Sequence, residues 1–156
     1  MNLTYNYSPN FELKKRKPDQ IKFIIFHYTG MKKESDAIKR LTNIQSEVSS
    51  HYLIKNNGEI ITLVPDLYVA WHAGKSIYEG IKDCNDYSIG IELEGCDDIS
   101  FENIQYIKLS EIIITLIDNY KYLSEDRIVS HSDIAPGRKS DPGPLFDWKR
   151  LKTMIK

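Results

Sequence analysis

The sequence predicts an α/β fold in which α-helices flank a mixed β-sheet. Three observations lead to this expectation. The chain has 156 residues, about the length of one domain. Strand-length apolar segments interleave with segments of helical periodicity, which favours a sheet covered by helices. An Asn57-Gly58 turn between residues 52–55 and 59–64 predicts a β-hairpin, which interrupts a pure alternation of parallel strands and helices.

The N-terminal part of the chain differs from the rest in composition. Residues 1–20 are polar and irregular and are expected to form an N-terminal arm, with residues 21–156 as a single domain. The basic run at residues 14–17 is expected to be solvated, as short charged runs usually are. Residues 21–26 are apolar on both faces, which predicts a central strand covered on each side and followed directly by His27.

The middle of the chain alternates between helix and strand patterns. Residues 35–43 have helical periodicity, with Ser35 as the expected N-cap. Residues 87–94 alternate as a strand does. One face of this strand carries Ile89, Ile91 and Leu93, and the other carries Ser88, Gly90, Glu92 and Glu94.

The C-terminal third adds two helices and a strand. Residues 103–120 are expected to form a long helix. Its apolar stripe is Ile104, Ile107, Ile113, Leu116, Ile117 and Tyr120. Residues 127–129 are expected to form a short strand, and residues 146–155 a terminal helix with Asp147 near its N-terminal end.

Composition excludes several classes of protein. With 41% hydrophobic and 28% charged residues, the chain suits a soluble globular protein. The formal net charge of −1 gives no reason to expect binding to nucleic acid or to an anionic membrane. No apolar segment has the length of a signal peptide core or a membrane span. Cys84 and Cys96 are expected to be free thiols in a reducing compartment, which favours the cytoplasm.

A loop at residues 130–143 carries the most chemistry. It can hold His131 and Asp141 as two ligands of one metal ion, with Lys139 close enough for its charge to act there. His27 and His131 each follow a short strand, where side chains project into the crevice of an open sheet. Two imidazoles, one carboxylate and an open water position describe a catalytic zinc site. A lone histidine is more often structural, however, and an aspartate before proline also suits a simple turn.

Other polar residues leave alternatives open. Either Glu92 or Glu94 is a candidate general base beside a metal-bound water, but a solvated edge strand fits the same pattern. Lys139 is either an oxyanion stabiliser or a surface charge. The Trp71-His72 pair suits a sugar- or peptide-binding wall as well as it suits a packed interior.

Six motifs occur in order and together resemble the type 2 N-acetylmuramoyl-L-alanine amidases, in particular those that act on 1,6-anhydro muropeptides. The likeness runs from about residue 22 to residue 148. The motifs are FHYTG at 26–30, SHYLI at 50–54, GEI at 58–60, AWHAG at 70–74, NDYSIGIELEG at 85–95 and the loop at 130–143.

The resemblance implies a mixed sheet flanked by helices, which peptidoglycan recognition proteins and amidase-type phage lysozymes share. It implies a Zn²⁺ ion held by His27, His131 and Asp141. It also implies Glu92 as catalytic acid/base and Lys139 as stabiliser of the transition state. The substrate-binding residues that it implies are Trp71, His72 and Arg138.

Two positions near His51 depart from related patterns. Phage-type relatives have a tyrosine before the corresponding histidine, whereas Ser50 stands here, which leaves Glu92 as the acid/base. Basic residues are expected to hold the carboxylates of the stem peptide, but the segment before His51 carries Glu47.

The implied reaction is zinc-dependent hydrolysis of the amide between the lactyl group of (1,6-anhydro-)N-acetylmuramic acid and L-alanine of the stem peptide, in peptidoglycan recycling or turnover. One alternative is a phage-type or autolytic amidase that acts on intact peptidoglycan. An alternative of another class is a non-catalytic peptidoglycan-binding protein. The expected partner is a muropeptide or peptidoglycan fragment, and the expected state is a monomer.

Overall fold

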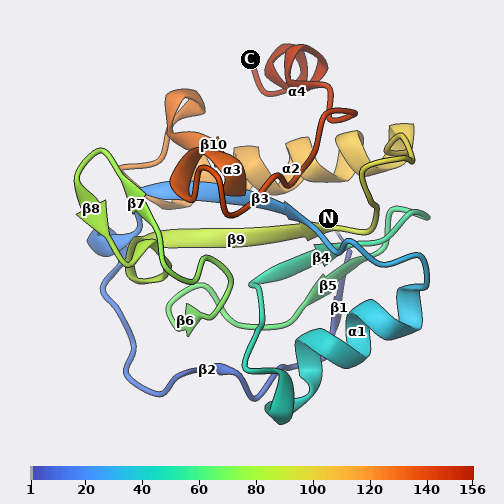
Figure 1. Ribbon diagram of the computed structural model, residues 1–156. Helices are drawn as coiled ribbons and strands as arrows, with labels where there is room; N and C mark the ends of the chain where they lie inside the picture. The colour runs from blue at the N-terminus through green and yellow to red at the C-terminus, as the bar shows by residue number, and fades with distance from the viewer. Residues whose placement is uncertain (1) are drawn as a thin grey trace.

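The computed structural model describes residues 2–156 and confirms the predicted fold class (Figure 1). A six-stranded sheet has the order β1-β5-β4-β9-β3-β10. Strands β4, β9, β3 and β10 run parallel to one another, while β5 and β1 run the opposite way. The strands are β1 (Leu3–Tyr5), β3 (Phe23–Tyr28), β4 (Tyr52–Ile54), β5 (Ile60–Thr62), β9 (Ser88–Leu93) and β10 (Ile128–Ser130).

Helices and smaller strand pairs complete the fold. In Figure 1, α2 and α4 lie on one side of the sheet and α1 on the other. The α-helices are α1 (Glu34–Thr42), α2 (Asn103–Asn119), α3 (His131–Ile134) and α4 (Trp148–Met154). Two small antiparallel pairs join β2 (Phe11–Glu12) to β6 (Val69–Ala70) and β7 (Ile77–Tyr78) to β8 (Ile81–Lys82). Short 3-10 helices are η1 (Pro18–Gln20), η2 (Ile44–Ser46), η3 (Cys84–Tyr87) and η4 (Glu125–Arg127).

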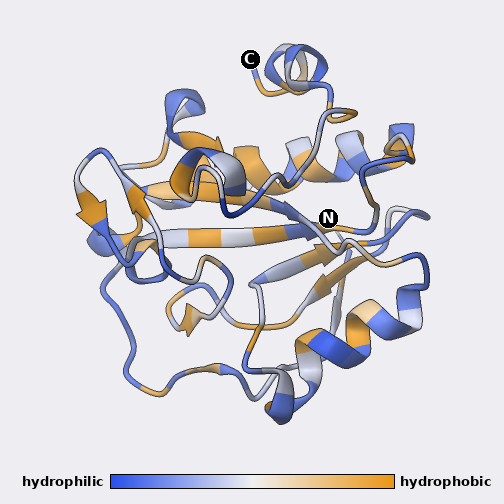
Figure 2. Ribbon diagram, viewed as in Figure 1, coloured by the Kyte–Doolittle hydropathy of each residue, from blue (hydrophilic) through white to orange (hydrophobic). Residues whose placement is uncertain are grey.

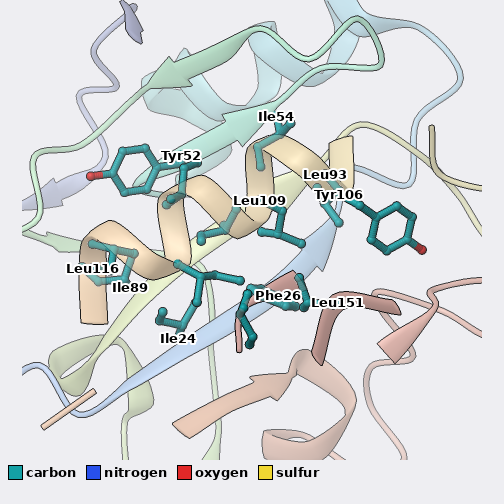
Figure 3. Close-up of a cluster of buried hydrophobic side chains, with 14 of the residues drawn as sticks. Ile24, Phe26, Tyr52, Ile54, Ile89, Leu93, Tyr106, Leu109, Leu116 and Leu151 are labelled. Atoms are coloured by element: carbon teal, nitrogen blue, oxygen red, sulfur yellow. The ribbon is translucent and has the colours of Figure 1, made fainter. Parts of the chain in front are cut away.

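The larger part of the core lies between the sheet and the α2–α4 layer (Figure 3). Ile89 and Leu93 of β9 point into it, together with Ile24 and Phe26 of β3, which confirms the predicted alternation in β9. Leu109 of α2 packs against them. Each such side chain stabilises the fold by about 1.5–3 kcal/mol when it leaves water. Figure 2 shows the same concentration of hydrophobic residues along the inner strands and α2.

The opposite face of the sheet is covered in two separate patches. Phe23 and Ile25 of β3 pack against Ile134 of α3. Leu41 of α1 packs against Leu53 of β4. The polar side chains of this face therefore lie between two apolar patches and beneath α1, which is where the candidate site forms.

The predicted hairpin is confirmed, and Gly58 adopts a positive φ of 83° at its turn. The predicted N-cap of α1 is wrong by two residues. Lys33 occupies the N-cap position without a side-chain hydrogen bond, and Ser35 lies inside the helix. Glu34 and Asp36 place negative charge in the first turn, where the helix dipole favours it.

The predicted stripe of α2 is only partly right. Ile113 and Leu116 are buried, but Ile104 and Ile107 are partly exposed. Gln105 takes an inward position instead, because its Nε2 donates to the carbonyl oxygen of Glu94 at 2.9 Å. The buried face of the helix is rotated accordingly and consists of Gln105, Tyr106, Leu109, Ser110, Ile112, Ile113 and Leu116.

The N-terminal residues pair with strands of the fold, although their composition predicts an irregular arm. β1 extends the central sheet, and β2 pairs with β6. Arg16, expected in a solvated run, is buried, and its Nη1 and Nη2 donate to the carbonyl oxygens of Asn85 and Asp66 at 3.0 and 2.8 Å. These carbonyls attract the guanidinium to the interior, which a count of charges along the chain does not reveal.

Two further observations concern residues 2–156. Both cysteines are free thiols, Cys84 buried and Cys96 partly exposed. Within this part of the chain, none of the helices combines the length and the apolar character that a membrane crossing needs.

Candidate active site

Three parallel strands bring the predicted site residues to one edge of the sheet. His27 near the end of β3 and Glu92 near the end of β9 are register partners. His131 opens α3 directly after β10, which pairs with β3 on its other side. Because the carboxyl ends of adjacent parallel strands meet at one edge, the three side chains share the crevice where α/β sheets bind ligands.

The ligand atoms of His27, His131 and Asp141 converge on one point. The Nδ1 atoms of the two histidines lie 2.9 Å apart, and each lies 3.0 Å from Oδ2 of Asp141. All three residues are buried. Such a group of two imidazoles and a carboxylate can hold a metal ion.

Local structure sets the direction of His131. Ser130 caps α3: its Oγ accepts from the backbone N–H of Asp133 at 3.0 Å, and Oδ2 of Asp133 accepts from the backbone N–H of Ser130 at 2.8 Å. At the far side of the ring, Nε2 of His131 lies 3.0 Å from the carbonyl oxygen of Ala73. A carbonyl oxygen only accepts, so Nε2 carries the hydrogen and Nδ1 of neutral His131 offers a lone pair.

The charges of the cluster suit a cation. Burial lowers the pKa of His27 to about 4, so its imidazole is neutral at pH 7. Oδ2 of Asp141 lies 3.0 Å from Nδ1 of His131, and both atoms offer lone pairs, so no hydrogen bond relieves the repulsion between them. A divalent cation between these atoms would remove their repulsion.

Glu92 faces the same crevice. Its Oε2 is buried and has no hydrogen-bond partner among residues 2–156. Burial raises the pKa of Glu92 well above its ordinary value, and the negative charge of Asp141 adds to the effect. A carboxyl group with a raised pKa and a free oxygen is suited to hold and release a proton.

A cavity of about 340 Å³ opens over these residues. Arg40 of α1, Arg138 and Lys139 line it, as do Trp71 and His72. Lys139 makes no ion pair with any described residue, whereas Nη2 of Arg138 donates to the carbonyl oxygens of Ala73 and Lys75, both at 2.7 Å. The cavity therefore combines an aromatic wall with an excess of positive charge.

Two polar residues near the site serve the fold instead. Glu94, the other carboxylate considered as a base, accepts from the backbone N–H of Asn56 at 2.8 Å and supports the hairpin. His51 is fully buried, and its Nδ1 accepts from the backbone N–H of Gly90 at 3.0 Å. Neither residue lines the cavity.

Sequence reasoning gave no role to two residues that support the site. Oδ1 of Asn85 accepts from the backbone N–H groups of His72 and Ala73 at 3.1 and 2.7 Å. Ser88 lies 3.3 Å from Nε2 of His72. The position of Ser88 on the polar face of a strand was the only available signal, and the sequence around Asn85 carried no signal for its role.

Comparison with known proteins gives concordant results. Residues 17–144 match the N-acetylmuramoyl-L-alanine amidase family. The 1,6-anhydro-N-acetylmuramyl-L-alanine amidase AmpD of Salmonella typhimurium (strain SL1344) is 48% identical over 108 residues. This match covers 69% of the chain and spans 57% of the length of the Salmonella protein.

Two solved structures are similar over most of the chain. A crystal structure of a selenomethionine derivative of AmpD superposes with a TM-score of 0.86 and 33% identity, covering 99% of this chain and 94% of that one. The Escherichia coli amidase AmiD has a TM-score of 0.78 and 38% identity, covering 86% of this chain and 57% of that one. AmiD was solved in complex with the substrate anhydro-N-acetylmuramic acid-L-Ala-D-γ-Glu-L-Lys.

Proposed function

The chain belongs to the N-acetylmuramoyl-L-alanine amidase family, and on that premise we propose that it hydrolyses the amide between the lactyl group of 1,6-anhydro-N-acetylmuramic acid and L-alanine of the stem peptide. The observation that carries this proposal is the convergence of three ligand atoms within 3.0 Å, beside a carboxyl group that has a free oxygen in the same cavity.

His27, His131 and Asp141 are proposed to hold Zn²⁺. Two neutral imidazole nitrogens and one carboxylate oxygen form a ligand set that catalytic zinc takes, with a further position open to water or substrate. Zinc, when bound, supplies Lewis acidity that polarises a carbonyl group and activates water near neutral pH. The Nε2 atom of each imidazole has a hydrogen-bond partner, which keeps the Nδ1 atoms of both rings directed at the cluster.

Glu92 is proposed to move the proton of the reaction. Its free Oε2 accepts a proton from water as the water oxygen bonds to the carbonyl carbon of the substrate. As the carbon–nitrogen bond breaks, the same carboxyl group delivers that proton to the amine of L-alanine. Lys139, whose Nζ is free of ion pairs within residues 2–156, stabilises the negative charge that develops on the carbonyl oxygen.

The cavity fits an anionic peptide attached to a sugar. The guanidinium of Arg40 and the ammonium of Lys139 offer partners for the carboxylates of a stem peptide. Trp71 offers an aromatic face, and Arg138 supports the wall beside it. The names of AmpD and AmiD and the ligand of AmiD support a muropeptide as the substrate. Peptidoglycan recycling is the process that this substrate implies, and we propose a cytoplasmic, monomeric enzyme.

Mass spectrometry of reaction products tests the proposal. The wild-type protein should convert an anhydro-muropeptide into the anhydro sugar and the free stem peptide. Glu92→Gln should lower the rate by roughly 10²–10⁴-fold, because it removes the proton acceptor. Glu94→Gln is the matched control, since it makes the same change at a carboxylate that supports the hairpin, and should keep the rate.

Parallel incubation with intact sacculi separates the alternatives. Cleavage of sacculi without cleavage of the anhydro-muropeptide would contradict the proposed substrate and indicate a lytic amidase. If neither substrate were cleaved while the muropeptide still bound, a non-catalytic binding role would replace the proposal.

A further inference from the structure

A second layer of polar residues lies behind His27. His72 is buried, and its Nδ1 lies 2.9 Å from Nε2 of His27, the ring nitrogen that points away from the ligand cluster. The other nitrogen of His72, Nε2, lies 3.3 Å from Oγ of Ser88. Both ring nitrogens of His72 are thus engaged inside the protein, although the sequence suggested that this residue contacts substrate.

The directions of these hydrogen bonds follow from the hydrogen bond that Ser88 donates to Cys84. The hydroxyl of Ser88 donates to the carbonyl oxygen of Cys84 at 2.6 Å. A hydroxyl has a single hydrogen, so Ser88 can only accept from His72. Neutral His72 then carries its hydrogen on Nε2, and its Nδ1 accepts. His27 must therefore donate from Nε2, which leaves the lone pair of its Nδ1 facing the cluster.

We propose that His72 is a positioning residue which, together with Ser88, holds His27 in the tautomer that binds a metal ion. The inference rests on the zinc site of the proposed function and adds a residue that sets the state of one ligand. Outer partners of this kind orient metal-binding imidazoles and raise their affinity. The carbonyl oxygen of Ala73 does the same for His131, so adjacent residues of one segment orient both imidazoles.

The surrounding structure is built to hold His72 in this place. The side chain of Asn85 fixes the backbone of His72 and Ala73. The ring of His72 lies directly against β9 at Gly90, where a Cβ atom would come within 2.4 Å of Cγ of His72 and 2.5 Å of its Nδ1. Ser88 and Gly90, four and two residues before Glu92, thus lie on the same polar face of β9 and contact His72 from there.

Two substitutions at position 72 separate positioning from simple packing. His72→Asn keeps a side-chain acceptor near the place of Nδ1 in a smaller side chain. His72→Leu fills more of the volume but offers no acceptor. Zn²⁺ affinity, measured by competition with a chelator, should fall by roughly 10–100-fold in His72→Leu and should be largely kept in His72→Asn. Wild-type affinity in His72→Leu, or equal losses in both variants, would overturn the proposal.

A second measurement does not depend on those variants folding. Nitrogen NMR of the ¹⁵N-labelled, Zn²⁺-loaded wild type should show neutral His72 with its hydrogen on Nε2. A hydrogen on Nδ1 of His72 would overturn the proposal.

Ser88→Ala should also weaken Zn²⁺ binding. Ser110 is a buried serine on α2 that bonds its own helix, so Ser110→Ala should leave Zn²⁺ binding unchanged. Equal Zn²⁺ affinities of these two variants would overturn the role proposed for Ser88.

The outcomes also distinguish this inference from the proposed function. A wild-type protein that binds no Zn²⁺ would overturn both. A wild type that binds Zn²⁺ and cleaves the muropeptide, with a His72→Leu variant that does so equally well, would overturn the positioning role alone.

Discussion

At the scale of single residues, the candidate site depends on where side chains are absent as well as present. Gly90 occupies the middle of a six-residue strand, where glycine is ordinarily unfavourable. Its missing side chain makes room for the ring of His72, which in turn contacts His27. The sequence showed only a glycine on the polar face of a strand, and the ring that fills the space comes from 18 positions earlier in the chain.

Gly90→Ala should destabilise the protein and weaken its metal site together. The added Cβ forces the His72 ring away from β9, and such overpacking costs about 1–3 kcal/mol. Urea unfolding of the metal-free protein measures the change in the free energy of unfolding. In a His72→Ala background the cost should shrink, because the Cβ then meets no ring. An equal cost in both backgrounds would contradict this explanation.

At the scale of elements, short motifs place the functional groups at the ends of strands. The Ser130 cap ends β10 and starts α3, so that His131 takes the first position of the helix. Asp147 caps α4 in a similar way by accepting from the backbone N–H of Arg150 at 2.9 Å. The two caps are chemically alike, but only the first one adjoins the candidate metal cluster.

Ser130→Ala and Asp147→Ala should therefore have the same effect on stability and different effects on metal binding. Each removes one N-cap and should cost about 0.5–2 kcal/mol of unfolding free energy. Only Ser130→Ala should weaken Zn²⁺ binding, because it frees the first turn that directs His131. Thermal or urea unfolding and chelator competition, run on both variants, measure the two effects. Loss of Zn²⁺ affinity in Asp147→Ala would show that cap loss acts through general instability.

The sequence could predict those elements whose patterns are local. The hairpin at Asn57-Gly58 and the alternation in β9 follow from turn chemistry and a period of two, and both are confirmed. The positions of His27 and Glu92 at the ends of strands followed from the same patterns. The buried face of α2 depends on contacts from other parts of the chain, such as that of Gln105 with the carbonyl oxygen of Glu94, and local periodicity does not contain them.

At the scale of the whole molecule, the N-terminal segment is connected to the site through buried polar groups. Arg16 bonds the carbonyl oxygen of Asn85, and the side chain of Asn85 holds the backbone at His72. None of these contacts lies within one element. Composition alone placed the N-terminal residues outside the fold, because polar residues that are buried by distant partners look the same in a sequence as solvated ones.

Stability of the metal-free protein should fall as the pH decreases from about 6.5 toward 4. Burial lowers the pKa of His27 to about 4 and the pKa values of His51 and His72 well below 6.5. On unfolding these imidazoles regain an ordinary pKa and take up protons, so the unfolded state is favoured by acid. Each proton contributes a slope of about 1.4 kcal/mol per pH unit.

Urea unfolding at a series of pH values measures this slope. The three buried histidines each take up a proton on unfolding in this range, whereas Glu92, whose pKa burial raises, releases one, so the net slope should approach two protons taken up. An unfolding free energy that stays constant between pH 7 and pH 5 would contradict the buried, neutral state of these rings.

The proposed function requires that His27, His131 and Asp141 hold a zinc ion which the amidase reaction needs. The most direct measurement is mass spectrometry of anhydro-muropeptide cleavage by the protein before metal removal, after chelation and dialysis, and after addition of one equivalent of Zn²⁺. Activity should disappear on chelation, return with Zn²⁺, and fail to return in Asp141→Ala. Full activity in the chelated protein, or recovery in Asp141→Ala, would contradict this requirement.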